Sequence, residues 1–442
     1  MQKRILFIVA MALMSISSIM AHVTTSGMSG KVTMQATGEE VIGATVQATH
    51  VPSGTKYAAV TNTKGIYSIQ GMRAGGPYTV TVSYIGAQTK TFEDLQLSLG
   101  ETFGLPVELV DDTQQLGEIV VTGEAGLAAS RTGAAQTINA ARLAELPSIN
   151  HSVADVARIN PFVKVSEGGA MNIAGSNNRY NAIQIDGAVA NDVFGLTSNG
   201  ANGGQAGTQP FSMETIDQLQ VSIAPFDVRQ SGFTGGAINA ITKSGTNEFH
   251  GSAYTYFQNG DLVGDKYQLH DKSGTSAEYG SMTDYTLGAT LGGPIVKDKL
   301  FFFANWERTS KEYDNAWSSD NGMSKVDFAV ANNILNYVKE QAAAQGVLYT
   351  GTLGTPKEYT YSDKVGLKLD WNINDRNHAS LRWSFVDAKQ NNNTSGSSAL
   401  NTNDYAYDFV SKTNSLIRIF FSTLRHYRRF LNCTFNLYHI KF

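Results

Sequence analysis

Residues 291–307 read Leu-Gly-Gly-Pro-Ile-Val-Lys-Asp-Lys-Leu-Phe-Phe-Phe-Ala-Asn-Trp-Glu, two strand-forming runs around the polar turn 297–299. Just upstream, residues 285–292 alternate Tyr, Leu, Ala and Leu on one face with Thr and Gly on the other. The same period of two recurs at 365–372 and 379–386, where one face is apolar with Trp and the other is largely polar and charged. This pattern predicts antiparallel hairpins, either in a soluble sandwich or in a barrel that spans lipid.

Loop lengths decide between these two architectures. Strands are expected at about 284–296 and 300–309, and again at about 360–372 and 378–389, and each pair is joined by a short turn. The segment between the two hairpins, 310–359, is long and contains a helical pattern. Short turns at one end and long loops at the other are typical of outer-membrane barrels. The hairpins therefore predict a β-barrel whose apolar face meets outer-membrane lipid.

Residues 124–248 predict a mixed α/β unit ahead of the barrel. Short helices are expected at about 139–146 and 153–159, followed by strands at 182–185, 218–223 and 237–242. Four glycines on either side of the strand at 237–242, Gly232, Gly235, Gly236 and Gly245, are expected to adopt backbone conformations closed to other residues.

Two long runs in this unit carry a family resemblance. They read Arg-Tyr-Asn-Ala-Ile-Gln-Ile-Asp-Gly-Ala (179–188) and Pro-Phe-Asp-Val-Arg-Gln-Ser-Gly-Phe-Thr-Gly-Gly-Ala-Ile-Asn-Ala-Ile-Thr-Lys-Ser-Gly-Thr-Asn (225–247). Together with 291–307, they resemble Oar-like TonB-dependent receptors. The resemblance implies that residues 124–248 form a plug, that the barrel begins at 249, and that the protein resides in the cell outer membrane.

A Gly/Asn-rich loop, residues 191–210, lies inside the predicted plug. A structureless loop of this length indicates either disorder or a binding loop. As a ligand-facing plug loop it would offer polar and aromatic contacts from Asn191, Asp192, Phe194, Asn199, Asn202 and Gln205.

The linker ahead of the plug, residues 110–123, contains an extended stretch that could add as a strand to the edge of another protein's sheet. By its position this stretch resembles the TonB box, which implies contact with the periplasmic C-terminal domain of TonB. The same sequence is also an ordinary strand fragment. We call it the box segment: Glu118, Ile119, Val120, Val121 and Thr122.

Residues 27–109 predict a small all-β domain. Alternation at 44–49 and 78–84, with turn residues between, indicates about seven short strands packed as a sandwich. The runs 61–67 and 78–86 resemble the carboxypeptidase regulatory-like domain, which implies a transthyretin/Ig-like β-sandwich with a structural or interaction role.

The two ends differ from the body of the chain. Lys3 and Arg4, a ten-residue apolar run and small residues up to Ala21 predict a cleaved signal peptide at 1–21, because the run is too short to span roughly 30 Å of hydrocarbon. Residues 411–442 contain Lys and Arg but no Asp, Glu or Gly. This change favours a frameshift over a basic terminal strand.

Six barrel strands are expected within residues 249–416, at about 251–258, 284–296, 300–309, 360–372, 378–389 and 405–416. Barrels with a plugged lumen have about 22 strands. Six strands cannot close around a plug and would leave open edges. The pattern therefore predicts a truncated N-terminal fragment that is unable to transport.

Composition excludes several classes of protein. A net charge of −4 argues against nucleic acid as a partner, and the single Cys433 cannot form an internal disulfide. The eight His residues show no metal-ligand spacing, and no nucleophile or phosphate-loop motif is present. We therefore predict no catalytic residue, no cofactor, no metal and no enzyme activity.

The predicted fold class is mainly β: an N-terminal transthyretin/Ig-like β-sandwich, a mixed α/β plug and a partial antiparallel transmembrane β-barrel. The predicted function is that of a TonB-dependent outer-membrane receptor for energised uptake of a bulky solute, here as a fragment. The alternative is a non-transporting surface or periplasmic binding protein, or adhesin, that uses the β-sandwich. The sequence does not identify the solute.

Overall fold

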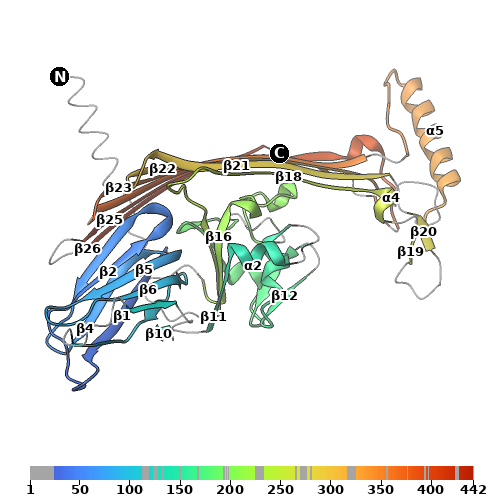
Figure 1. The fold of residues 1–442 in the computed structure, drawn as a ribbon. Coiled ribbons are helices and arrows are strands. Elements are labelled where there is room, and N and C mark those ends of the chain that lie inside the picture. The colour runs from blue at the N-terminus through green and yellow to red at the C-terminus, as the bar shows by residue number, and fades with distance from the viewer. Residues whose placement is uncertain are drawn as a thin grey trace, which may run out of the picture.

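A small sandwich and a plug lie side by side along one face of a long antiparallel sheet in the computed structural model (Figure 1). The sandwich lies near one end of the sheet, and helix α5 (Phe328–Ala344) projects at the other. The predicted signal peptide lies outside the described residues. These are residues 24–441 without 112–118, 123–127, 131–133, 147, 149–150, 167–168, 193–194, 196, 198, 224–232, 264–265, 269–275, 279–280, 316–324, 355–356, 376, 393–394, 397 and 424–427.

Eight strands within residues 25–109 build the sandwich from two sheets, and β9 (Ile119–Thr122) and β10 (Ala128–Ser130) each extend one of these sheets. One sheet has the order β3-β2-β5-β6, and in the other β1 pairs with β4, β7 and β8. Alternate residues of β2 and β5 are buried between the sheets, as their period of two predicts. The strands are β1 (Thr25–Met34), β2 (Thr45–His50), β3 (Thr55–Val60), β4 (Ile66–Arg73), β5 (Gly75–Ser83), β6 (Lys90–Leu97), β7 (Thr102–Gly104) and β8 (Val107–Leu109).

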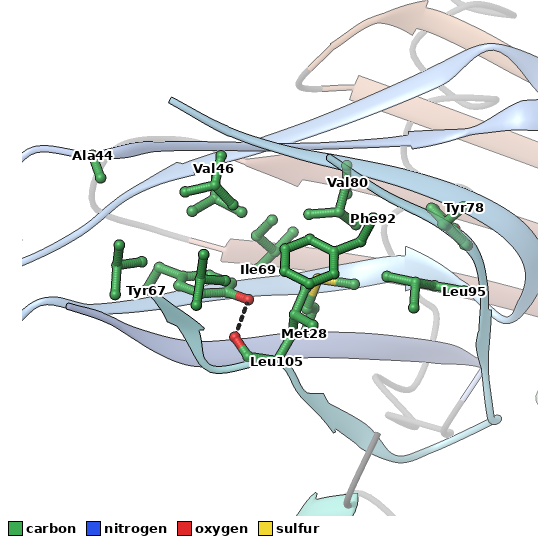
Figure 2. Close-up of a cluster of buried hydrophobic side chains, with 14 of the residues drawn as sticks. Met28, Ala44, Val46, Tyr67, Ile69, Tyr78, Val80, Phe92, Leu95 and Leu105 are labelled. Atoms are coloured by element: carbon green, nitrogen blue, oxygen red, sulfur yellow. Dashed lines mark hydrogen bonds between the residues drawn. The ribbon is translucent and has the colours of Figure 1, made fainter. Parts of the chain in front are cut away.

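The sandwich core is formed by large apolar side chains from both sheets. Figure 2 shows Met28, Val80 and Phe92 facing one another across this core. Burying a side chain of this size contributes about 1.5–3 kcal/mol to stability. The Tyr67 hydroxyl in this core is satisfied, because it donates a hydrogen bond of 2.8 Å to the Leu105 carbonyl.

His50 is a buried titratable group at the end of β2. Its Nδ1 lies 2.7 Å from Ser53 Oγ, and its ring packs 4.9 Å from that of Tyr78. Burial, and secondly repulsion by Arg73, lower the pKa of His50 to about 3. The folded domain therefore keeps this imidazole neutral at pH values at which an unfolded chain would protonate it.

Acidification is expected to destabilise the sandwich through His50. Below pH 6.5 the unfolded chain binds a proton, whereas the folded chain does not until about pH 3. Stability should therefore fall as pH falls, by up to about 1.4 kcal/mol per pH unit. Amide exchange of β2 and β5 in the full chain at pH 7 and pH 5 measures this change. His50→Gln should show a smaller loss, and an identical loss would contradict the assignment.

The plug forms around a five-stranded sheet with the order β11-β16-β17-β14-β15, in which β14 and β17 are parallel. Asn139 caps α2 and Ser152 caps α3, which explains why both predicted helices begin where they do. The elements are β11 (Ala134–Asn139), α2 (Ala140–Glu145), α3 (Val153–Ala157), β12 (Val163–Val165), β13 (Met171–Ile173), β14 (Ala182–Ile185), β15 (Ala188–Val189), β16 (Ile216–Ile223) and β17 (Gly236–Thr242).

The reason that we predicted for the plug glycines is wrong. Gly235, Gly236 and Gly245 do not have positive φ, and Gly232 lies outside the described residues. They are close-approach positions instead. A Cβ on Gly236 would lie 2.5 Å from the Ile173 side chain, and one on Gly245 would lie 2.3 Å from the backbone oxygen of a β22 residue.

The long sheet is antiparallel with the order β18-β21-β22-β23-β24-β25-β26. Among the described residues β18 and β26 each pair with one strand, so the sheet is open and the predicted partial barrel is confirmed. The strands are β18 (His250–Asn259), β21 (Met282–Val296), β22 (Leu300–Asp314), β23 (Lys357–Asn374), β24 (Asn377–Asn392), β25 (Tyr407–Thr423) and β26 (Arg428–Lys441). The shorter pieces α4 (Gly260–Val263), β19 (Lys266–Gln268) and β20 (Ser276–Glu278) connect β18 to β21.

The basic tail continues this sheet. Strand β26 was not among the six predicted strands, and it pairs with β25 from Val410↔Lys441 to Thr423↔Arg428. The frameshift interpretation of residues 411–442 stays a prediction, which resequencing of the gene would test.

The two faces of the sheet differ as the alternation predicts. Leu291 and Trp371 are half exposed on the outer face, whereas Lys368, Asp370 and Arg382 on the inner face are buried. The polar side chains therefore meet the plug and the sandwich, and the apolar ones face outward. No helix in the described part of the chain is long and apolar enough to cross a bilayer.

Candidate functional site

A buried ion cluster joins the plug to the inner face of the sheet. Asp186 lies at the two-residue turn between β14 and β15, where both it and Gly187 have positive φ. Its carboxylate accepts hydrogen bonds from the Thr242 N–H at 2.9 Å and the Thr242 hydroxyl at 2.6 Å. Arg382 Nε lies 3.3 Å and Lys368 Nζ 3.7 Å from the same carboxylate. Charge and hydrogen bonding together hold this turn against the long antiparallel sheet β18-β21-β22-β23-β24-β25-β26, which we call the wall.

The sandwich is attached to the same wall by Arg73. Its guanidinium lies 3.5 Å from the Asp370 carboxylate on β23. Burial, the largest single effect, would lower the pKa of Arg73, but the combined attraction of Asp370, Tyr57, Tyr78 and Asp217 outweighs it and raises the pKa. The cation therefore stays charged at the junction. A cavity of about 410 Å³ lies beside this pair, lined by residues of the sandwich, the plug and the wall.

Two glutamines of β16 attach the sandwich to the plug. Gln218 accepts from the Leu99 N–H at 2.9 Å and donates to the Leu97 carbonyl at 3.1 Å. Gln220 donates to the Leu99 carbonyl at 2.6 Å. Both side chains are buried, so these amides take the place of water for backbone groups that would otherwise be unsatisfied.

A second cavity, of about 690 Å³, lies between the plug and the wall, and we call it the plug–wall cavity. This volume is within the range typical of small-molecule sites. Its lining is mixed polar and apolar and carries both signs of charge, from residues that include His151, Glu214, Tyr256, Glu307, Lys311 and Lys364.

Glu307 is a buried residue in the lining of this cavity. Lys364 Nζ lies 2.8 Å from one carboxylate oxygen, and the hydroxyls of Ser212 and Tyr254 donate to the other. Because these donors satisfy the carboxylate, Glu307 connects the plug to β18, β22 and β23 and has little capacity left for a solute.

The rim of the plug–wall cavity carries the groups that are available to a solute. The rings of His151 and Tyr256 stack with centroids 3.6 Å apart, and the Tyr256 hydroxyl donates to Glu214 at 2.9 Å. Lys311 pairs with Asp284 at 2.9 Å. The rim therefore offers an aromatic surface beside a Lys–Asp ion pair whose partners could instead bind a solute. Such a surface suits a polar solute with an apolar part. In the described ranges, no group of three or more His, Cys, Asp or Glu side chains could hold a metal ion.

The predicted ligand loop lies partly at this cavity. Asn199 lines it, and its Oδ1 also accepts from a loop N–H at 3.0 Å. Asn191 bonds the backbone around β14, and Asp192 accepts from the Thr197 N–H at 2.7 Å. The hydrogen bonds of these two side chains stabilise the conformation of the loop itself.

Two of the remaining loop residues lie against the long sheet. Asn202 and Gln205 line a gap of only about 20 Å³ beside β25, and Thr208 Oγ1 donates to Ser362 on β23 at 2.9 Å. Phe194 lies outside the described residues. A solute-binding role for the six loop residues stays a prediction, and Asn199 is the one that lines the larger cavity.

The box segment does not extend freely from the sandwich. Ile119–Thr122 forms β9, which pairs in parallel with β6 from Lys90↔Ile119 to Glu93↔Thr122. Glu118 lies outside the described residues. The next strand, β10 (Ala128–Ser130), pairs with β7 of the other sandwich sheet. Ile119–Thr122 is therefore already paired with the sandwich, and the predicted contact with TonB is not tested by this pairing.

Sequence reasoning did not single out the residues that hold the three parts together. Asp186 had a local signal, because Asp-Gly between two short apolar runs predicts a tight hairpin turn. Arg73, Asp370 and Gln218 had none, since each meets its partner through long-range contacts.

Comparison with known proteins adds two family matches. Residues 27–110 match the carboxypeptidase regulatory-like domain, and residues 241–321 match the outer membrane beta barrel domain. The first match confirms the resemblance noted for the sandwich, and the second confirms the predicted outer-membrane barrel strands.

Two curated relatives match over most of this chain. The TonB-dependent transporter Oar of Myxococcus xanthus is 28% identical over 316 residues, which cover 66% of this chain and 28% of the relative. The probable TonB-dependent siderophore receptor PirA of Acinetobacter baumannii is 24% identical over 297 residues, covering 62% and 33%. The chain thus spans about a third or less of the length of these relatives.

Solved structures of outer-membrane proteins are also similar. The outer membrane transporter YddB of Escherichia coli has a TM-score of 0.46 at 16% identity, covering 66% of this chain and 37% of the other. The siderophore receptor PirA of Pseudomonas aeruginosa has a TM-score of 0.43 at 14% identity, covering 70% and 41%.

Proposed function

We propose that this chain, a homologue of the TonB-dependent receptors and a protein of the outer membrane, carries the TonB-engaging and solute-facing parts of a receptor for energised uptake of a bulky solute. TonB would engage the box segment from the periplasm, and the solute would enter the plug–wall cavity from the opposite side. The order of parts along the chain supports this role: sandwich, box segment, plug and then barrel strands.

The observation that carries the proposal is the path from the box segment to the plug. Residues after β10 lead directly into β11, which is an edge strand of the plug sheet and pairs only with β16 among the described strands. A pull on the box segment would therefore load the pairing of β10 with β7 first and, once that pairing separates, β11. An edge strand held by one neighbour can separate without breaking the centre of the sheet. Force on the linker could thus separate β11 from the plug sheet, while the ion cluster of Asp186 keeps β14 and β17 attached to the wall.

Binding to TonB can be tested by disrupting the strand character of the box segment. Val120→Pro with Val121→Pro removes two backbone donors and should abolish capture by the TonB C-terminal domain in a pulldown, because strand addition depends on main-chain hydrogen bonds. The control, Val120→Thr with Val121→Thr, keeps the donors and the β-propensity and should bind like the wild type. Binding that survives deletion of residues 118–122 would refute the assignment.

Capacity for transport is a separate question, because the chain spans only part of its relatives. We propose that the chain acts as a fragment that can engage TonB but cannot transport by itself. The alternative, a non-transporting binding protein or adhesin, predicts a soluble periplasmic product. Membrane fractionation of the expressed chain distinguishes the two: recovery in the outer membrane supports the receptor role, and recovery in the periplasm supports the alternative.

A further inference from the structure

We propose that the sandwich presents the box segment to TonB as a ready-formed edge strand, so that TonB adds to β9 while β9 stays paired with β6. This inference rests on the proposed function and concerns how the same segment is recognised. The surface is the outer edge of β9 together with the sandwich sheet behind it, and its occupant is the TonB C-terminal domain.

The first observation is the place of β9 in the sheet. The order β3-β2-β5-β6-β9 makes β9 the terminal strand, with β6 on one side and no partner on the other among the described residues. Four consecutive residue pairs set its register against β6. A strand directs its backbone groups to two edges, and pairing with β6 uses one of them. The other edge remains available for strand addition by a partner.

The second observation is that the chain is tied to the sandwich on both sides of β9. Before it, Asp111 bridges to Ala87, and the Gln88 N–H donates to the Val110 carbonyl at 2.8 Å. After it, β10 pairs with β7 at Phe103 and Thr102. Only residues 112–118 and 123–127 separate β9 from these anchors. Short tethers of this kind give the strand a high effective concentration at the β6 edge, which favours the docked state.

The physical consequence is preorganisation. A free pentapeptide must lose its backbone freedom when TonB binds it, whereas a docked strand has already lost it during folding. The full chain should therefore bind the TonB C-terminal domain about tenfold or more tightly than a peptide of residues 113–125. If the sandwich instead hid the segment, the peptide would bind more tightly than the chain.

A cross-link tests whether docking and TonB binding are compatible. In a Cys433→Ser background of the full chain, Glu93→Cys with Thr122→Cys places two thiols at register partners of β6 and β9. Oxidation should form the disulfide, and affinity for the TonB C-terminal domain, measured by calorimetry, should change less than about threefold. Loss of binding on oxidation that is restored by reductant would overturn the proposal, because TonB binding would then require β9 to separate from β6.

The matched control is Lys90→Cys with Thr122→Cys. These positions are three residues out of register, about 10 Å along the strand, which is too far for a disulfide. If this pair cross-links as readily as the first, or if the first pair does not cross-link, β9 is not docked as described and the proposal fails. If the reduced chain does not bind TonB at all, the proposed function itself fails, while cross-linking still reports on docking.

Discussion

Replacing Asp186 by alanine is expected to destabilise the plug–wall contact by about 3–5 kcal/mol, the usual cost of removing one partner from a buried ion cluster. Lys368 and Arg382 would remain buried without their shared carboxylate, and Thr242 would lose the acceptor for its N–H and hydroxyl. Alanine also fits poorly at φ +47°, a conformation that aspartate and asparagine tolerate better. Amide exchange of β14 and β17 in urea, with the chain in detergent, measures the loss.

Two variants separate the causes of this effect. Asp186→Asn keeps an acceptor for Thr242 and a residue suited to positive φ, so it should show mainly the loss of charge. Asp363→Ala removes a carboxylate that pairs with Arg308 at 2.8 Å on the exposed part of the wall. An exposed pair contributes about 1 kcal/mol or less. If Asp186→Ala were no more destabilising than Asp363→Ala, the ion cluster would not be what holds the plug.

Gly30→Ala is expected to destabilise the sandwich by about 3 kcal/mol or more, at or beyond the upper end of ordinary overpacking. A Cβ at Gly30 would lie 1.9 Å from the Leu105 carbonyl oxygen and 2.6 Å from the Leu105 carbonyl carbon. Leu105 lies between β7 and β8, which both pair with β1, and its N–H donates to the Ser29 carbonyl at 2.9 Å. The methyl group can fit only if this backbone moves, which would break that bond and the contact of Tyr67 with Leu105.

The readout for Gly30→Ala is the urea dependence of amide exchange in β1, β7 and β8. Gly354→Ala is the matched control, because no atom lies within 4 Å of the added Cβ and φ is not positive. It should change stability by less than about 0.5 kcal/mol. Equal stability of the two variants would show that the close approach at Gly30 relaxes without cost.

Local pattern was sufficient to predict most of the strands. The predicted strand at 182–185 coincides with β14, and the hairpin strands at 284–296 and 300–309 lie inside β21 and β22. The alternation also predicted which face is polar, since successive side chains of a strand point to opposite faces. The helical pattern between the hairpins became α5 for a similar reason: its spacing is a property of neighbouring residues.

The site was less accessible to sequence reasoning. The loop 191–210 was recognised as unusual, but its composition could not show that Asn202 and Gln205 would lie against β25 while Asn199 reaches the plug–wall cavity. The glycine-rich run was recognised too, yet for the wrong reason. Close approach depends on what packs opposite, and Gly236 meets Ile173, which lies far earlier in the chain.

The sequence by itself determined the kind of protein, because signal-like, plug-like and barrel-like patterns are each encoded within a few dozen residues. Only the tertiary structure decided how the parts hold one another. Asp186 meets Arg382, Arg73 meets Asp370, and the box segment pairs with β6. These contacts join residues whose local sequence carries no trace of the partner, since burial and pairing across a fold depend on the whole chain. The hairpin pattern at 291–307 predicts a barrel wall, whereas the tertiary structure shows that the plug and the sandwich are attached to the polar face of that wall.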